Sequence, residues 1–267
     1  MGSEWDKEDR KPLLEKWFST LSAKEWYVLG IVALLSGVLG TLFFTTALLK
    51  VNFIPFSVVF LIQKLQPIFA VAMAWVVLKE TPTARYWAWA AFALVAGYFV
   101  TFPMGIVNVS AGGAYVTAAL FALAAAIAWG SSTALSRYTL LNHSNTLITG
   151  LRFLLTVPIA LVFIFAMGAL PSFSAVTPVQ YATLAAIALS TGMLALWIYY
   201  RGLRTTPVRV SAIVELAFPM TAVAIDYFLY GVTLNWTQYL AAAVLLFAMY
   251  RVSKLQQSEG VNPSNIG

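Results

Sequence analysis

Two polar residues inside an apolar stretch are the first candidates for binding chemistry. Gln63 and Lys64 lie within LIQKLQPIFAVAMAWVVL (61–78), where Pro67 follows three residues after the lysine. An ammonium group in hydrocarbon costs at least ~2.5–3.5 kcal/mol on insertion scales, so it must face a protein interior or water. Lys64 is therefore expected to hold a carboxylate, and Gln63 and Pro67 are expected to share its site. Snorkelling of the long side chain to the membrane surface is the alternative for Lys64.

A carboxylate occupies the matching place in a second apolar stretch. Glu215 shares a helical stripe with Ser211, Pro219, Ala222 and Asp226, at successive spacings of three or four residues. We interpret Ser211, Glu215 and Pro219 as substrate-binding candidates. For Glu215 the alternative is a structural ion pair with a nearby arginine, and Asp226 is interpreted as a hydrated carboxylate near the outer membrane surface.

Lys64 and Glu215 are expected at similar depth. Lys64 is ten residues into the predicted span 54–78, and Glu215 is seven residues into the span 208–230 from the opposite side. At a rise of 1.5 Å per residue these positions are about 15 and about 10 Å deep in a core of about 30 Å. The sequence therefore predicts that the two groups face each other, directly or across a substrate. Pro67 and Pro219 would bend their helices and free backbone carbonyls there, or serve only as packing kinks.

The elements that position these residues are predicted to be membrane-spanning helices. The chain of 267 residues is 61% hydrophobic and only 10% charged, whereas soluble domains carry about 25% charged residues. Apolar runs long enough to cross a bilayer recur along the chain. The expected class is an all-α polytopic helical membrane protein, with eight spans predicted at 26–49, 54–78, 85–103, 113–136, 146–168, 179–200, 208–230 and 235–252.

The basic residues predict how the helices are oriented. If the N-terminal segment 1–24 is cytoplasmic, 14 of the 16 Lys and Arg residues fall on the cytoplasmic side, Lys50 falls outside and Lys64 lies within a span. This asymmetry follows the positive-inside rule, so both termini, including the tail 254–267, are predicted to be cytoplasmic. Segment 1–24 has no apolar core typical of a cleavable signal. An integral protein of the cell or inner membrane is expected.

The chain partly matches itself after a shift of 152 residues. Gly40 falls on Gly192 and Pro67 falls on Pro219, so the second predicted helix moves onto the seventh. Five crossings separate these mates, which therefore run in opposite directions, as in the inverted repeats of secondary transporters. We expect an incomplete first repeat at 25–103 and a second repeat at 113–253. Helices four and five have no mate, so either the chain is truncated at its N-terminus or it is a natural eight-helix variant.

Three stretches resemble one transporter family. QPIFAVAMAWVVLKE (66–80) resembles the proline-to-glutamate segment of the EamA-type drug/metabolite transporter superfamily, with Pro67 and Glu80 thirteen residues apart. AALFALAAAIAWGSSTALSRYTL (118–140) resembles the helix that opens the family's second half. The stretch from Leu189 to Gly231 resembles its next-to-last helices. The chain departs from the family in having eight helices where ten are usual, and in having Val232 where the glutamate would recur.

The resemblance implies a secondary transporter of small organic metabolites or drugs, by analogy an exporter, that works by alternating access around a midplane cavity. Lys64 would hold a substrate carboxylate while Glu215 holds an amine or a proton, so proton coupling is one expectation. Trp129 and Trp197 are expected to line the cavity. The alternative is a fragment that does not transport, or a membrane scaffold that oligomerises. Homo-oligomer formation is compatible with both functions.

Other function classes are excluded or disfavoured. The chain has no cysteine and one histidine, so thiolate metal sites and histidine metal clusters are excluded and no cofactor is expected. The net charge of +6 is spread over short loops, which argues against nucleic acid as a partner. No nucleophile and base are paired within a predicted span, so an enzyme is not expected. The predicted partners are a small-molecule substrate and the lipid bilayer.

Overall fold

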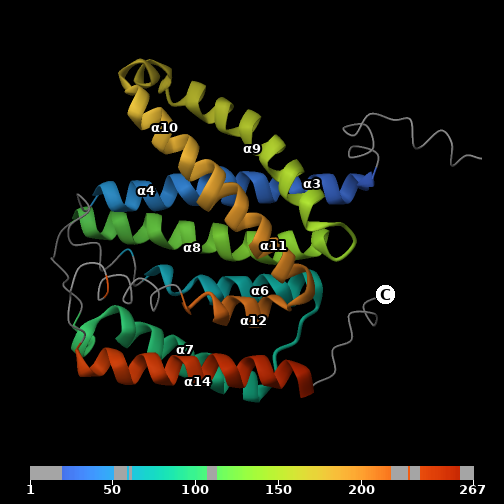
Figure 1. Cartoon of the computed structure of the whole chain (residues 1–267), viewed down its shortest axis with the longest axis vertical. Helices are drawn as coiled ribbons and strands as arrows, with labels where there is room; N and C mark the ends of the chain where they lie inside the picture. The colour runs from blue at the N-terminus through green and yellow to red at the C-terminus, as the bar shows by residue number, and fades with distance from the viewer. Residues whose placement is uncertain are drawn as a thin grey trace, which may run out of the picture. The chain divides into compact units, whose positions relative to one another are not determined.

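In the computed structural model, residues 20–50, 59, 62–106, 113–217, 228 and 235–258 are described. All regular structure in these ranges is helical, which confirms the predicted all-α class (Figure 1). The elements are α3 (Ala23–Val32), η1 (Ala33–Leu39), α4 (Gly40–Lys50), α6 (Gln66–Leu78), α7 (Ala84–Thr101), η2 (Pro103–Gly105), α8 (Gly113–Leu140), α9 (Asn145–Ala166), η3 (Leu170–Ala175), α10 (Pro178–Ile187), η4 (Ala188–Leu194), α11 (Ala195–Thr205), α12 (Val208–Val214) and α14 (Trp236–Ser258).

Helical segments occur at all eight predicted spans. Within the described ranges, four stretches are long and apolar enough to cross a membrane: Ala23–Lys50, Val116–Leu140, Asn145–Ala166 and Pro178–Thr205. Helices α6, α7, α12 and α14 lie at the other four predicted spans. The expected ends are close to the observed ends for most helices, since loop prolines and charged residues mark them.

Small polar residues begin several of these helices. Ser22, Thr83, Ser144 and Thr177 stand at the N-caps of α3, α7, α9 and α10, and each side-chain oxygen accepts a backbone N–H of the first turn. These contacts satisfy N–H groups that lack a partner within the helix. The helix starts are therefore fixed by local chemistry as well as by the membrane.

The chain divides into two compact units. The first consists of Met1–Val38 and Leu135–Arg204. In it α3 packs on α9. A Cβ atom added at Gly37 would lie 2.6 Å from the Thr156 hydroxyl, so this glycine lets η1 approach α9 closely.

The second unit consists of Leu39–Ala134 and Thr205–Gly267. Two helix pairs pack side by side in it: α6 against α12, and α7 against α14 (Figure 1). The 152-residue shift superposes α7 on α14, and it superposes the two predicted spans, 54–78 and 208–230, to which α6 and α12 belong. Alanines bring α7 and α14 together, since Ala93 and Ala248 are both 0% exposed.

The helical irregularities also coincide under the shift. The π-helical segment Ala33–Leu39 moves onto residues 185–191, which overlap the second π-helical segment, Ala188–Leu194. Turns interrupt the other pair, at Lys64–Leu65 and at Glu215–Leu216. Because the shift moves Lys64 onto Leu216, the two interruptions fall at equivalent places.

The predicted kink at Pro67 is wrong in detail. Residues 62–63 are helical, but Lys64 and Leu65 form a turn, and α6 starts only at Gln66. Pro67 therefore stands in the first turn of a helix, where its missing N–H has no partner to lose. The proline starts a helix at this point instead of bending a continuous one. Its repeat mate Pro219 lies outside the described residues.

Candidate functional site

A cavity of about 450 Å³ lies within the second unit. It falls in the size range of small-molecule sites, roughly 300–1,000 Å³. The two helix interruptions meet at this cavity, because residues from both line it. Its lining consists of Phe44, Gln63, Lys64, Gln66, Pro67, Trp129, Glu215 and Leu216.

Three polar side chains of the lining form a chain of hydrogen bonds. Gln66 Nε2 donates to Glu215 Oε2 at 3.1 Å, and Gln63 Nε2 donates to Gln66 Oε1 at 3.3 Å. The remaining oxygen, Gln63 Oε1, is buried and has no hydrogen-bond partner within the described ranges. Buried acceptors without a donor are uncommon in proteins and costly. We call Gln63, Gln66 and Glu215 the amide relay.

Lys64 lines the same cavity as Glu215. Within the described ranges no ion pair joins them, and the amide of Gln66 is the group that contacts the carboxylate. The Lys64 side chain is half-buried. The hypothesis that the two charges act together across a substrate stays a prediction, and direct pairing is absent from this arrangement.

An aromatic pair forms another wall of the cavity. The rings of Phe44, on α4, and Trp129, on α8, lie 5.3 Å apart between centroids with an interplanar angle of 49°. Next to Trp129, a Cβ atom added at Gly130 would lie 2.6 Å from the Gln66 carbonyl oxygen and 3.0 Å from Ala70 N. The absent side chain thus lets α8 approach the backbone of α6, which holds Trp129 beside the start of α6.

The remaining predicted site residues fall in different places. Ser211 lies on α12, half-buried, and its carbonyl accepts the Glu215 N–H at 2.9 Å, but it does not line the cavity. Trp197 belongs to the first unit, where its Nε1 donates to Thr146 Oγ1 at 2.9 Å. Pro219 and Asp226 lie outside the described residues.

Sequence reasoning missed three lining residues, Gln66, Phe44 and Leu216. Gln66 had a usable signal, since it lies one turn after Gln63 beside the proline. The prediction also counted Arg152 with the cytoplasmic residues, although it is seven positions into its span. Arg152 Nη1 donates to the Tyr200 hydroxyl at 2.7 Å, and that oxygen lies 2.7 Å from Ser136 Oγ.

Glu80, at the end of the proline-to-glutamate segment, contacts the start of α12. Its carboxylate oxygens accept the backbone N–H groups of Val208 and Arg209 at 3.3 and 3.4 Å. The Arg209 guanidinium donates to the Thr81 carbonyl at 2.9 Å, and the Tyr86 hydroxyl donates to the Arg209 carbonyl at 2.8 Å. Glu80 therefore acts as a helix cap, and these contacts tie the end of α6 to the helix that carries Glu215.

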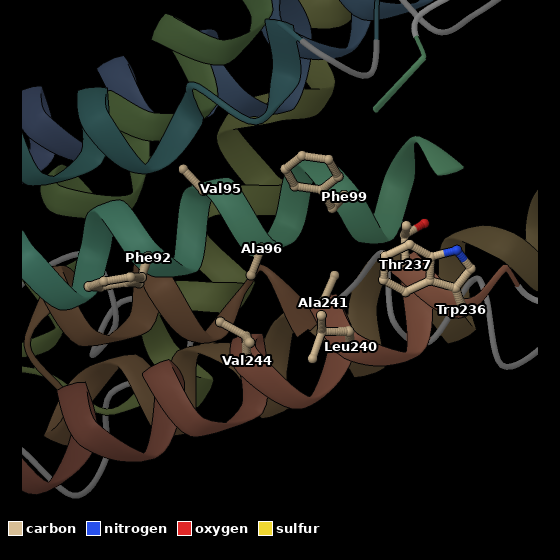
Figure 2. Close-up of a pocket in the computed structure, with 9 residues that line it drawn as sticks. All are labelled: Phe92, Val95, Ala96, Phe99, Trp236, Thr237, Leu240, Ala241 and Val244. Atoms are coloured by element: carbon tan, nitrogen blue, oxygen red, sulfur yellow. The ribbon is translucent and has the colours of Figure 1, made fainter. Parts of the chain in front are cut away.

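A second pocket of about 280 Å³ lies between α7 and α14 (Figure 2). Its lining is apolar apart from the Thr237 hydroxyl. Large side chains on it, such as Phe92 and Leu240, are more than half exposed. Because this pocket has no charged group to orient a polar molecule, it is a weaker candidate for substrate binding than the cavity.

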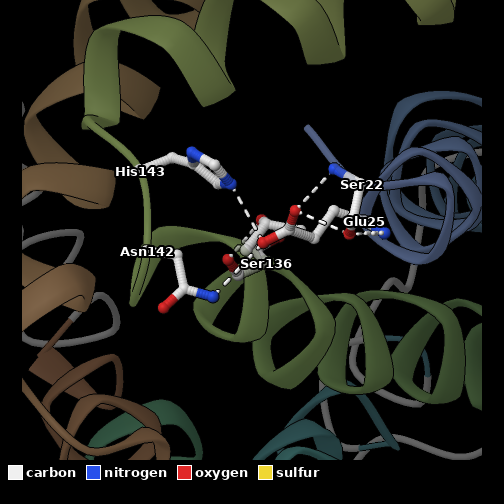
Figure 3. Close-up of polar contacts among 6 residues, drawn as sticks. Ser22, Glu25, Ser136, Asn142 and His143 are labelled. Atoms are coloured by element: carbon white, nitrogen blue, oxygen red, sulfur yellow. Dashed lines mark hydrogen bonds and ion pairs between the residues drawn. The ribbon is translucent and has the colours of Figure 1, made fainter. Parts of the chain in front are cut away.

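A polar cluster of the first unit surrounds Glu25 (Figure 3). Ser22 N and Ser22 Oγ each donate to Glu25 Oε2 at 2.8 Å. Asn142 Nδ2 donates to Glu25 Oε1 at 3.2 Å, and His143 Nε2 lies 2.9 Å from the same oxygen. Each carboxylate oxygen therefore has two partners. The cluster ties the α8–α9 loop to the start of α3, and we call it the Glu25 cluster.

Within the described ranges, no group of three or more His, Cys, Asp or Glu side chains is placed to hold a metal ion.

Comparisons with known proteins agree with the helical architecture and with a cavity for a small molecule. The model of the EamA-like transporter family matches residues 11–102 and 116–254. Riboflavin transporter ImpX of Fusobacterium nucleatum subsp. nucleatum is 34% identical over 224 residues, which cover 84% of this chain and 75% of the relative. A solved crystal structure aligns with a TM-score of 0.65 at 19% identity, covering 91% of this chain and 79% of its own, and this likeness concerns the fold alone. The chain belongs to the EamA-like transporter family and is an integral membrane protein that transports small molecules.

Proposed function

We propose that this protein transports riboflavin, or a flavin of the same ring system, through the cavity between α6, α12, α4 and α8. The 34% identical relative is named a riboflavin transporter. The cavity lining supports the same chemistry. Phe44 and Trp129 offer aromatic faces to a planar ring, while Lys64 and the amide relay offer polar groups to its carbonyl and N–H groups.

The observation that carries this proposal is the mixed lining of the cavity. A flavin combines a flat, largely apolar ring with a polar edge and a hydroxylated chain. Binding of such a molecule needs a few directed polar groups in a mostly apolar wall, which is the usual make-up of a small-molecule site. The pocket between α7 and α14 lacks these polar groups.

The proposed mechanism is alternating access around this cavity. The two interrupted helices that reach the cavity resemble the discontinuous helices of secondary transporters, whose breaks lie at substrate sites. A substrate held at both interruptions contacts two helices that run in opposite directions in the predicted repeat. Movement of one helix relative to the other then opens the cavity to one side of the membrane at a time.

Export, cytoplasmic termini, proton coupling and homo-oligomerisation stay predictions of the sequence. Export predicts that flavin trapped inside right-side-out cells or vesicles leaves faster when the protein is present. Proton coupling predicts that an imposed pH gradient drives flavin accumulation in vesicles that hold no flavin gradient.

The test is riboflavin counterflow in proteoliposomes. Vesicles preloaded with unlabelled riboflavin should take up external labelled riboflavin faster than protein-free vesicles, with saturation. The Glu215→Ala variant should lose most of this flux, whereas the variant Lys50→Met, at an exposed site outside the cavity, should keep it. Wild-type flux equal to that of protein-free vesicles would overturn the proposed substrate.

A further inference from the structure

We propose that the amide relay sets the substrate specificity of the cavity, by presenting Gln63 Oε1 as an acceptor for the imide N–H of a flavin ring. The inference rests on the proposed function, and it identifies the imide N–H as the group of the substrate that the site recognises. Gln63 thereby becomes a specificity-determining residue, and Gln66 and Glu215 become positioning residues for it.

The carboxylate determines the direction of the relay. An ionised carboxylate only accepts hydrogen bonds, so the group of Gln66 that faces Glu215 must be its NH₂. Gln66 therefore turns its oxygen toward Gln63, and the NH₂ group of Gln63 donates a hydrogen bond to that oxygen. One charge at the end of the chain thus fixes the orientation of both amides.

With the two amides oriented in this way, one oxygen of the amide relay remains as an unused hydrogen-bond acceptor. Gln63 Oε1 is buried, and none of the residues that the structure describes donates a hydrogen bond to it. Gln63 also lines the cavity, so a small rotation of its amide would bring this oxygen to the cavity surface. A buried acceptor without a donor is costly, and a ligand N–H that enters the cavity removes that cost. The site therefore favours a ligand that brings an N–H donor to this point.

The neighbouring residue adds the complementary group. Lys64 lines the cavity beside Gln63 and has only donors to offer. An acceptor next to a donor matches an N–H flanked by a carbonyl. The pyrimidine edge of a flavin presents this pattern, because its imide N–H lies between two carbonyl groups. A ribityl hydroxyl could occupy the same acceptor, but it would not require the N–H.

The experiment compares two ligands that differ at one atom. Riboflavin and 3-methylriboflavin share the ring and the ribityl chain, but a methyl group replaces the imide N–H in the second. Equilibrium binding to the purified protein in nanodiscs is measured by quenching of flavin fluorescence. The wild type should bind 3-methylriboflavin at least about tenfold more weakly than riboflavin, about 1.4 kcal/mol.

Two variants separate hydrogen bonding from a clash with the methyl group. Gln63→Leu keeps the size of the side chain and removes the acceptor, so riboflavin binding should weaken and the ratio between the ligands should fall to about threefold or less. Glu215→Gln lets the relay run in either direction, so the ratio should fall there too. Lys50→Met should keep the wild-type ratio.

The outcomes distinguish the inference from the proposed function. Equal binding of the two flavins to the wild type, or an undiminished ratio in Gln63→Leu, would overturn the role of Gln63 while leaving riboflavin as the substrate. Absence of binding of either flavin to the wild type would overturn the proposed function itself. The comparison of the two flavins on the wild type needs no variant, so it tests recognition of the imide N–H even if Gln63→Leu does not fold.

Discussion

Two carboxylates of this molecule lie in polar clusters of opposite character. Glu25, in the first unit, has two hydrogen-bond partners on each oxygen and joins a loop to a helix start. Glu215, in the second unit, anchors the amide relay, which ends in a buried acceptor for which the described part of the chain offers no donor. A satisfied cluster stabilises one arrangement, whereas an unsatisfied one beside a cavity is completed by a ligand.

The difference gives each cluster a separate experimental signature. Disruption of the Glu25 cluster should lower stability and leave substrate affinity unchanged. Disruption of the cavity should lower riboflavin affinity. Removal of the Lys64 charge, for which the described residues show no partner, should not lower stability.

The largest effect is expected for Gly130→Ala, which damages the cavity through its framework. The new methyl group would overlap the Gln66 carbonyl oxygen, 2.6 Å away, and backbone atoms cannot yield cheaply. Overpacking of this kind costs up to about 3 kcal/mol, so both the melting temperature and riboflavin affinity should fall.

Gly30→Ala is the matched control, because a Cβ atom at Gly30 meets nothing within 4 Å. Its melting temperature should equal or exceed that of the wild type. An equal response of the two glycine variants would show that α8 and α6 are not in close contact at Gly130.

Glu25→Ala should destabilise the protein by about 2 kcal/mol, because it removes a buried carboxylate that completes the capping box of α3 and accepts hydrogen bonds from Ser22 and Asn142. Thermal unfolding in detergent measures the change. Riboflavin affinity, measured well below the melting temperature, should stay at the wild-type value. A loss of affinity without a loss of stability would reverse the roles assigned to the two clusters.

Lys64→Met should weaken riboflavin binding by about tenfold, or about 1.4 kcal/mol, and should raise the melting temperature. A half-buried ammonium for which the described part of the chain shows no hydrogen bond or ion pair opposes folding, and methionine removes that cost. Lys50→Met, at an exposed site, should change neither quantity. If Lys64→Met binds riboflavin as the wild type does, the lysine has no part in the site.

Tyr86→Phe should have the smallest effect, about 1 kcal/mol, since it removes one buried hydrogen bond to the Arg209 carbonyl. Chemical denaturation measures the change, and riboflavin affinity should not respond. A larger loss of affinity than of stability would mean that the contacts at the start of α12 also position Glu215.

The sequence alone was sufficient for the helical class, the family and most helix ends. Apolar runs, loop prolines and the spread of basic residues report directly on membrane insertion, so these features can be read without tertiary contacts. Lys64 and Glu215, which the sequence predicts at similar depth, both line one cavity in the structure, and their depth in the membrane stays a prediction.

The side-chain contacts within the site could not be predicted from the sequence. Lys64 and Glu215 were expected to face each other, directly or across a substrate, and the sequence did not reveal that Gln66 contacts the carboxylate. Trp197 was expected at the cavity, and the sequence did not reveal the hydrogen bond that its indole N–H donates to Thr146 in the first unit. Hydropathy reports whether a helix spans a membrane, and it does not report where the helix breaks or which of its faces meets which neighbour.

The central claim is that the cavity of the second unit binds the transported flavin. A crystal structure of the protein grown with riboflavin tests this most directly. We predict density for the flavin ring beside Phe44 and Trp129, with its imide edge within hydrogen-bond distance of Gln63 Oε1. Ordered flavin density elsewhere on the molecule, with this cavity empty, would contradict the account.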